Sequence, residues 1–130
     1  MSKILKIRAR QVFDSRGNPT IEAEVYSKNL SASAICPSGA STGTYEAFEK
    51  RDSNNKKYLG KSVLGAVNLV NTKISKKLSG ANIHDQTRID TILINLDGTR
   101  QKNKLRSKCY FSSVYGCQET FCKNQECAFI

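Results

Sequence analysis

Residues 37–43, Pro-Ser-Gly-Ala-Ser-Thr-Gly, combine a flexible backbone with closely spaced hydroxyl groups. Gly39 and Gly43 can adopt positive φ angles and let the backbone come close to a ligand. Ser38, Ser41 and Thr42 supply oxygens that suit a hard cation or a phosphate group. The segment is not a Walker loop, because no Gly-Lys-Ser/Thr sequence ends it. Taken alone, this composition predicts either a cation- or phosphate-binding loop or an ordinary surface loop.

The cysteines form a second candidate for chemistry, because four of the five lie between residues 106 and 130. Their spacing is C-x7-C-x4-C-x4-C, at positions Cys109, Cys117, Cys122 and Cys127. Structural zinc sites favour pairs spaced C-x2–4-C, so this pattern matches a zinc site poorly. The remaining cysteine, Cys36, precedes a proline and is expected to be a small buried residue. His84, the single histidine, is expected in a surface loop.

The net charge of +10 makes nucleic acid one candidate partner. The lysines are scattered rather than gathered into a dense block, and no aromatic residues alternate with them. We therefore expect a solvated basic surface and no nucleic-acid partner. No apolar run approaches the ~20 residues of a membrane helix, and no signal peptide is visible. A cytoplasmic protein without a membrane partner is expected.

The elements that would position these residues follow from hydrophobic periodicity. Residues 3–13 and 21–27 alternate apolar and polar side chains, which predicts two strands. Residues 14–20, Asp-Ser-Arg-Gly-Asn-Pro-Thr, have the composition of a turn, so the two strands should be antiparallel. Residues 30–36 are expected to form a third strand. The chain should therefore begin with a three-stranded antiparallel meander that runs directly into residues 37–43.

A helical period replaces this alternation after residue 60. One predicted helix has Ser62 as its cap and Gly80 just after its end, and its apolar face comprises Val63, Val67, Val70, Ile74 and Leu78. A second predicted helix is capped by Asp85, ends at Leu-Asp-Gly-Thr (96–99), and has an apolar face made of Ile89, Ile92, Leu93 and Leu96. The fold class is therefore α+β, a three-stranded antiparallel meander packed by a helical layer.

Three stretches together give these elements a family resemblance. DSRGNPTIEAEV (14–25), PSGASTGTYEAFEKRD (37–52) and IDTILINLDGT (89–99) resemble, in order and spacing, the N-terminal domain of enolases. The resemblance covers residues 1 to about 105. It implies a small cap domain that precedes a large α/β barrel in the family, and no barrel is expected in this chain.

The resemblance also implies an activity and a set of site residues. Enolases are lyases that interconvert 2-phosphoglycerate and phosphoenolpyruvate in glycolysis, with Mg²⁺ as cofactor and as homodimers. By position, Ser41 would ligate Mg²⁺, and Ser38, Gly39, Ala40, Thr42 and Gly43 would form the substrate loop. Arg10, Glu22 and Arg16 would lie at the dimer interface. The catalytic lysine and glutamate would lie in the barrel, so no catalytic residue is expected here and this chain alone should be inactive.

Residues 106–130 depart from the family pattern. The family continues with a helix beginning Gly-Ala-Asn-Ala-Ile-Leu-Ala-Val-Ser, where this chain reads RSKCYFSSV. Codons allowed for residues 106–117 read Gly-Ala-Asn-Ala-Ile-Leu-Ala-Val-Ser-Met-Ala-Val when the first base is dropped. We therefore expect an enolase-like domain at 1–105 and an out-of-frame, disordered tail at 106–130. The alternative is a small basic binding module whose Cys-rich tail binds zinc or nucleic acid.

Overall fold

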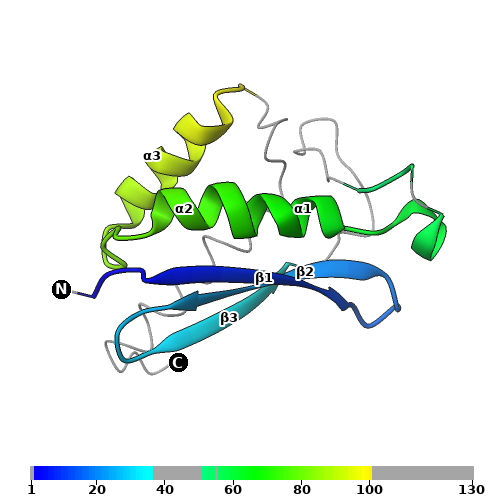
Figure 1. The fold of residues 1–130 in the computed structure, drawn as a ribbon, viewed down its shortest axis with the longest axis horizontal. Coiled ribbons are helices and arrows are strands. Elements are labelled where there is room, and N and C mark those ends of the chain that lie inside the picture. Colours follow the sequence, from blue (N-terminus) through cyan, green and yellow to red (C-terminus); the bar gives the residue numbers. More distant parts are fainter. Residues whose placement is uncertain (1, 37–50, 55, 101–130) are drawn as a thin grey trace.

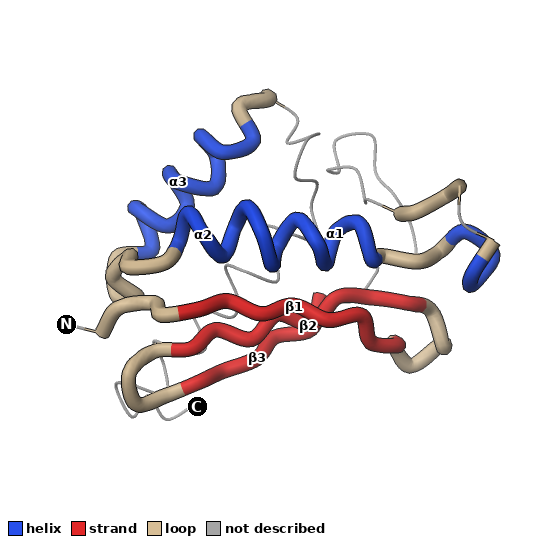
Figure 2. The backbone as a smooth tube through the Cα atoms, viewed as in Figure 1, coloured by secondary structure: helices blue, strands red, loops and turns tan. Residues whose placement is uncertain are grey.

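The fold is seen in a computed structural model that describes residues 2–36, 51–54 and 56–100. Three strands form one antiparallel sheet in the order β1-β2-β3, with β1 at Lys6–Phe13, β2 at Pro19–Tyr26 and β3 at Ser31–Cys36. A helical layer lies over one face of this sheet, as Figures 1 and 2 show. The α+β class and the three-stranded meander are confirmed. No barrel is present among the described residues.

Strict alternation of side chains gives the sheet one apolar and one charged face. Ile7 and Ala9 of β1 are buried, and so are Ile21, Ala23 and Val25 of β2. The residues between them point to the opposite face, because successive side chains of a strand alternate. The predicted strand at 3–13 begins three residues later than expected, and the predicted strand at 21–27 begins earlier, at Pro19.

The first helical stretch runs from residue 64 to residue 78 in three pieces. These are α1 (Leu64–Leu69), a π-helical turn η2 (Val70–Ile74) and α2 (Ser75–Leu78). Four residues of the predicted apolar face are fully buried, as predicted: Val63, Val70, Ile74 and Leu78. Val67 was also predicted on this face but is only partly buried, whereas the neighbouring Ala66 is fully buried. Gly80 has φ +83° just after the end of the helix, so the predicted C-terminal glycine is confirmed.

The start of this helix corrects one prediction. Ser62 does not cap it, because Val63 occupies the N-cap position and no side chain caps there. The Ser62 hydroxyl is buried and donates instead to Gln11 Oε1 at 3.1 Å. The Val63 amide donates to the same oxygen at 3.0 Å, and the Gly65 amide donates to the Asp52 carboxylate at 3.1 Å. Side chains distant in sequence therefore take the role that a local serine was expected to fill.

The second helix, α3 (Gln86–Asp97), follows the sequence pattern closely. Asp85 caps it by accepting a hydrogen bond from the Arg88 amide at 3.0 Å, and Gly98 ends it in the left-handed region. Ile89 and Leu93 are fully buried, while Ile92 and Leu96 pack partly buried against the same core. In Figure 1, α3 lies on the side of α2 that faces away from the sheet. Among the described residues, the first helical stretch therefore lies against the sheet, and α3 forms the outer part of the layer.

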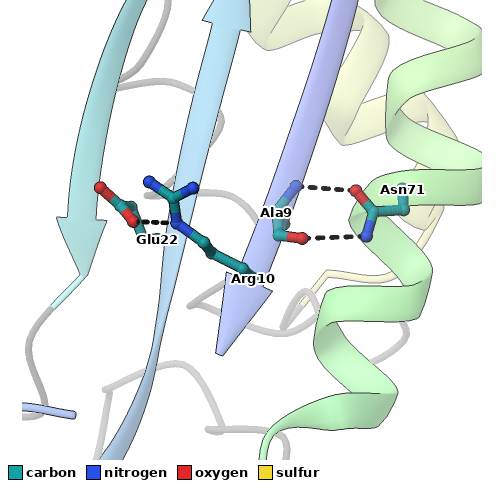
Figure 3. Close-up of polar contacts among 4 residues, drawn as sticks. All are labelled: Ala9, Arg10, Glu22 and Asn71. Carbon is teal, nitrogen blue, oxygen red and sulfur yellow. Dashed lines mark hydrogen bonds and ion pairs between the residues drawn. The ribbon is translucent and has the colours of Figure 1, made fainter. Parts of the chain in front are cut away.

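Polar side chains of the first helical stretch bond the outer edge of β1. Asn71 Oδ1 accepts from the Ala9 amide at 2.7 Å, and Asn71 Nδ2 donates to the Ala9 carbonyl at 3.0 Å (Figure 3). One helical turn later, the Ser75 hydroxyl accepts from the Ile7 amide at 3.2 Å. Four residues of helix rise about 6 Å and two residues of strand about 6.7 Å, so the two spacings nearly match. The helix thus takes the place that a fourth strand would occupy at this edge.

Candidate functional site

Arg10 and Glu22, two of the predicted interface residues, lie opposite each other on β1 and β2. Arg10 Nε donates to Glu22 Oε2 at 2.5 Å, on the sheet face away from the helices (Figure 3). The Arg10 side chain is 58% exposed and that of Glu22 is 13% exposed. The two groups therefore form an ion pair within one chain. Their predicted role at a dimer interface stays a prediction.

Arg10 and Glu22 shift each other's pKa in opposite directions. The hydrogen bond from Arg10 lowers the pKa of Glu22, burial opposes that shift, and a hydrogen bond with Ser33 supports it. The hydrogen bond to Glu22 and then its negative charge raise the pKa of Arg10. Both groups are thus held in their charged forms.

The third predicted interface residue, Arg16, lies in the exposed turn between β1 and β2. The Asp14 carboxylate organises this turn, because it accepts hydrogen bonds from the amides of Arg16 and Asn18, both at 2.9 Å. Gly17 completes it with φ +74°. The turn chemistry predicted for residues 14–20 is confirmed, and it fixes the Arg16 backbone at the tip.

The predicted substrate loop and Mg²⁺ ligand lie outside the described residues. They are Ser38, Gly39, Ala40, Ser41, Thr42 and Gly43. The described residues on either side of this segment are Cys36 and Arg51. Cys36 is partly buried, which corrects the expectation of a buried residue, and its carbonyl accepts a hydrogen bond from the Thr20 hydroxyl. Arg51 Nη1 donates to the Pro19 carbonyl at 3.0 Å. Both ends of the segment therefore meet the start of β2.

Residues near the end of β1 show strained backbone and exposed apolar side chains. The rings of Phe13 and Tyr58 meet edge to face with centroids 5.3 Å apart. Tyr58 and Leu59, in the 3₁₀ turn η1 (Lys57–Gly60), have φ angles of 53° and 55°, which non-glycine residues rarely adopt. Leu59 is 91% exposed. This corner therefore combines an unusual backbone conformation with an exposed apolar side chain.

Other candidate sites in the described part of the chain are sparse. No group of three or more His, Cys, Asp or Glu residues there could hold a metal ion. The described helices include none that is long and apolar enough to cross a membrane. His84 is exposed, as predicted. A groove of about 370 Å³ between α2 and α3 is lined by Lys77, Ile92, Asn95 and Leu96, none of which was predicted as a site residue.

Comparison with known proteins decides the family. The model for the enolase N-terminal domain matches residues 4–116. The chain belongs to the enolase family. It is 92% identical over 105 residues to the enolase of Pelagibacter ubique (strain HTCC1062). Those residues make up 81% of this chain but only 25% of that enolase, so the chain spans about a quarter of the length of its relative. The resemblance predicted from residues 14–25, 37–52 and 89–99 is confirmed.

Sequence reasoning missed the residues that hold this enolase-like domain together around the candidate site. Thr20 bonds Cys36 before the predicted substrate loop, Arg51 after it bonds Pro19, and Asp52 and Gln11 bond the start of the first helix. Their partners lie 10 to 52 residues away along the chain. No local spacing could have identified these contacts, since each depends on how the helix sits on the sheet.

Proposed function

We propose that this chain is the N-terminal part of an enolase that interconverts 2-phosphoglycerate with phosphoenolpyruvate and water. The observation that carries this proposal is the 92% identity over 105 residues to an enolase. That relative is about four times longer than the matched part, so the reaction belongs to the intact protein. A cytoplasmic location and a homodimeric state are part of the same proposal.

Within the intact enzyme, residues 37–43 would contact the substrate, and Ser41 would supply oxygen ligands to Mg²⁺. The described residues do not fit a Mg²⁺ site by themselves, because they hold no cluster of carboxylates or imidazoles. By resemblance to the family, most metal ligands would come from the barrel. The base that removes the proton beside the carboxylate, and the acid that assists departure of the hydroxyl group, would also lie there. A polypeptide of these 130 residues alone is therefore expected to show no turnover.

A chimeric enzyme tests this proposal. Residues 1–105 of this chain would replace the matching quarter of the Pelagibacter ubique enolase, and dehydration of 2-phosphoglycerate would be measured with and without Mg²⁺. We expect the chimera to turn over at a rate similar to that of the parent enolase, because the exchanged residues are 92% identical.

Substitution of Ser41 gives the specific arm of the test. Ser41→Ala in the chimera should lower kcat by about 100-fold or more, as expected for a group that orients the reacting centre. Ser31→Ala is the matched control, because Ser31 is an exposed serine of β3. A folded chimera without Mg²⁺-dependent activity would contradict the proposal, and so would a Ser41→Ala variant as active as Ser31→Ala.

A further inference from the structure

The outward-facing backbone groups of β1 are bonded by side chains of the helical stretch that packs beside them. The Ala9 amide donates to Asn71 Oδ1 at 2.7 Å, and the Ala9 carbonyl accepts from Asn71 Nδ2 at 3.0 Å (Figure 3). The Ile7 amide donates to the Ser75 hydroxyl at 3.2 Å. These amides and carbonyls are the groups that a neighbouring strand would bond if one lay at this edge.

The bonded edge continues before the start of β1. The Ser79 hydroxyl donates to the Leu5 carbonyl over a longer distance of 3.5 Å. The Ile4 amide donates to the Ala81 carbonyl at 2.9 Å, and the Ile4 carbonyl accepts from the Gly80 amide at 2.8 Å. The bonded part of this edge therefore extends from residue 4 to residue 9.

The π-helical turn η2 helps to keep the bonding side chains in line. Asn71, Ser75 and Ser79 are four residues apart, and in a regular α-helix each such step turns about 40° beyond a full turn. A π-helical turn is wider, because its hydrogen bonds span five residues. The Ser75 amide donates to the Val70 carbonyl in this way. The wider turn offsets part of the rotation, so the three side chains stay beside the edge of the strand.

We propose that this polar stripe, made of Asn71, Ser75 and Ser79, prevents β1 from pairing with β1 of a second copy of this chain. In an antiparallel pair of two β1 strands, Ile7 of each copy would face Ala9 of the other. Their outward-facing amides and carbonyls would then bond each other in place of the polar stripe. Asn71 is itself exposed, so a second chain can reach this border of the sheet.

The basic residues of β1 oppose the same pairing. Lys6, Arg8 and Arg10 alternate with the residues that bond the polar stripe, and all three are exposed. In an antiparallel pair of β1 strands, the basic residues of the two copies would lie across from each other, and like charges in that position are destabilising. Charged side chains are a common protection of sheet edges. Salt should weaken this repulsion, because the Debye length falls from about 10 Å at 0.1 M to about 3 Å at 1 M.

Self-association of the 130-residue chain tests the proposal. Asn71→Ala/Ser75→Ala removes the bonds to Ala9 and Ile7, so it should raise the self-association constant at least about tenfold at 1 M salt, because a freed edge is open to pairing. Sedimentation equilibrium with a reducing agent present is the measurement. Asn68→Ala/Thr72→Ala is the matched control, since these two residues are exposed and four apart in the same helical stretch. This control should associate no more than the unsubstituted chain.

Two further measurements separate edge pairing from a general loss of stability. Ile89→Val removes one buried methylene group from α3 and leaves the edge bonds intact, so it should not promote association. Hydrogen exchange identifies the surface that pairs. In Asn71→Ala/Ser75→Ala, the Ile7 and Ala9 amides should lose protection by about tenfold or more in dilute solution, because local opening becomes easier. They should regain it as the protein concentration rises.

The proposal fails if Asn71→Ala/Ser75→Ala associates no more than the unsubstituted chain, or if Ile89→Val associates equally. Association that leaves the Ile7 and Ala9 amides unprotected would also overturn it. Far-UV circular dichroism shows whether the double variant folds. If it does not fold, Asn71→Ala alone carries the test with the same outcomes, because the bond between Ser75 and Ile7 remains.

Discussion

At the scale of single residues, the charged face of the sheet is organised by cross-strand pairs. Arg10 lies opposite Glu22, and Arg8 lies opposite Glu24 on the same face. Opposite charges directly across an antiparallel pair stabilise the sheet and fix its register. The family resemblance assigned Arg10 and Glu22 to a dimer interface, and the fold shows that the two already neutralise each other within one chain.

The lowered pKa of Glu22 predicts a dependence of stability on pH. A carboxyl group with a lower pKa in the folded state stabilises the fold above its unfolded value of about 4.3, and this contribution disappears as the pH falls through the folded pKa. Glu22→Gln should therefore lower Tm at pH 7 by about 1–4 °C, a small effect because the pair is solvent-screened. At pH 3 the difference between the two proteins should shrink.

Thermal melts of the chain at pH 7 and pH 3 would measure this effect. Arg10→Gln should give a similar loss at pH 7, and the double variant should lose little more than either single one, because both remove the same interaction. A Tm difference that is equal at the two pH values would contradict the role given to Glu22.

At the scale of elements, the helical stretch 64–78 makes two kinds of contact with the sheet, through two adjacent rows of side chains along its surface. One stripe buries Ala66, Val70 and Ile74 against the sheet, and the neighbouring stripe places Asn71 and Ser75 against the edge of β1. Unpaired edges of a sheet are open to pairing with other chains. The polar stripe forms hydrogen bonds with backbone groups of Ile7 and Ala9 at this edge. The helix therefore covers one face of the sheet and also bonds part of its edge.

Asn71 makes two of the hydrogen bonds to the edge of β1, so its substitution gives a further prediction. Asn71→Ala should reduce the free energy of unfolding by about 0.5–1.5 kcal/mol, because the amide and carbonyl of Ala9 lose their partners at a partly buried edge. Asn68→Ala is the matched control, since Asn68 is an exposed asparagine in α1 and alanine favours helix there. Urea denaturation of both variants is the measurement. Equal stability of Asn71→Ala and Asn68→Ala would show that the edge contact contributes nothing.

At the scale of the whole molecule, the described residues form a small domain with a single core. The buried side chains come from β1, β2, the helical stretch 64–78 and α3, and they include Ile7, Val25, Val70 and Leu93. The chain spans about a quarter of the length of the Pelagibacter ubique enolase.

We also propose that residues 106–130 arise from a shifted reading frame. The supporting observation is that allowed codons for residues 106–117 contain Gly-Ala-Asn-Ala-Ile-Leu-Ala-Val-Ser-Met-Ala-Val in the next frame. The gene should therefore carry one extra base, or a net equivalent, near the codons for residues 104–106, followed in the restored frame by an enolase barrel. Sequencing across these codons is the measurement. A next frame that encodes neither this helix nor a barrel would rule the proposal out. These residues lie beyond the described part of the chain.

The sequence by itself determined the elements of this protein and its family. Strand alternation, helical periodicity, the Asp85 cap and the glycines at 80 and 98 are local signals, since each depends on residues within a few positions. The signatures around residues 14–25 and 37–52 identified the enolase family for the same reason. The substrate-loop residues, by contrast, were assigned by resemblance, and that assignment stays a prediction.

The tertiary structure alone decided which distant groups meet. Ser62 looked like a helix cap, but Gln11 and Asp52 bond the start of the first helix. Nothing local indicated that Asn71 would bond the edge of β1, or that Arg51 would join β2 to the approach to α1. Such contacts depend on where the helix packs on the sheet, and packing is set by the summed burial of many apolar side chains. Periodicity therefore predicts which face of an element is buried, whereas the fold determines the partner of each polar group at its border.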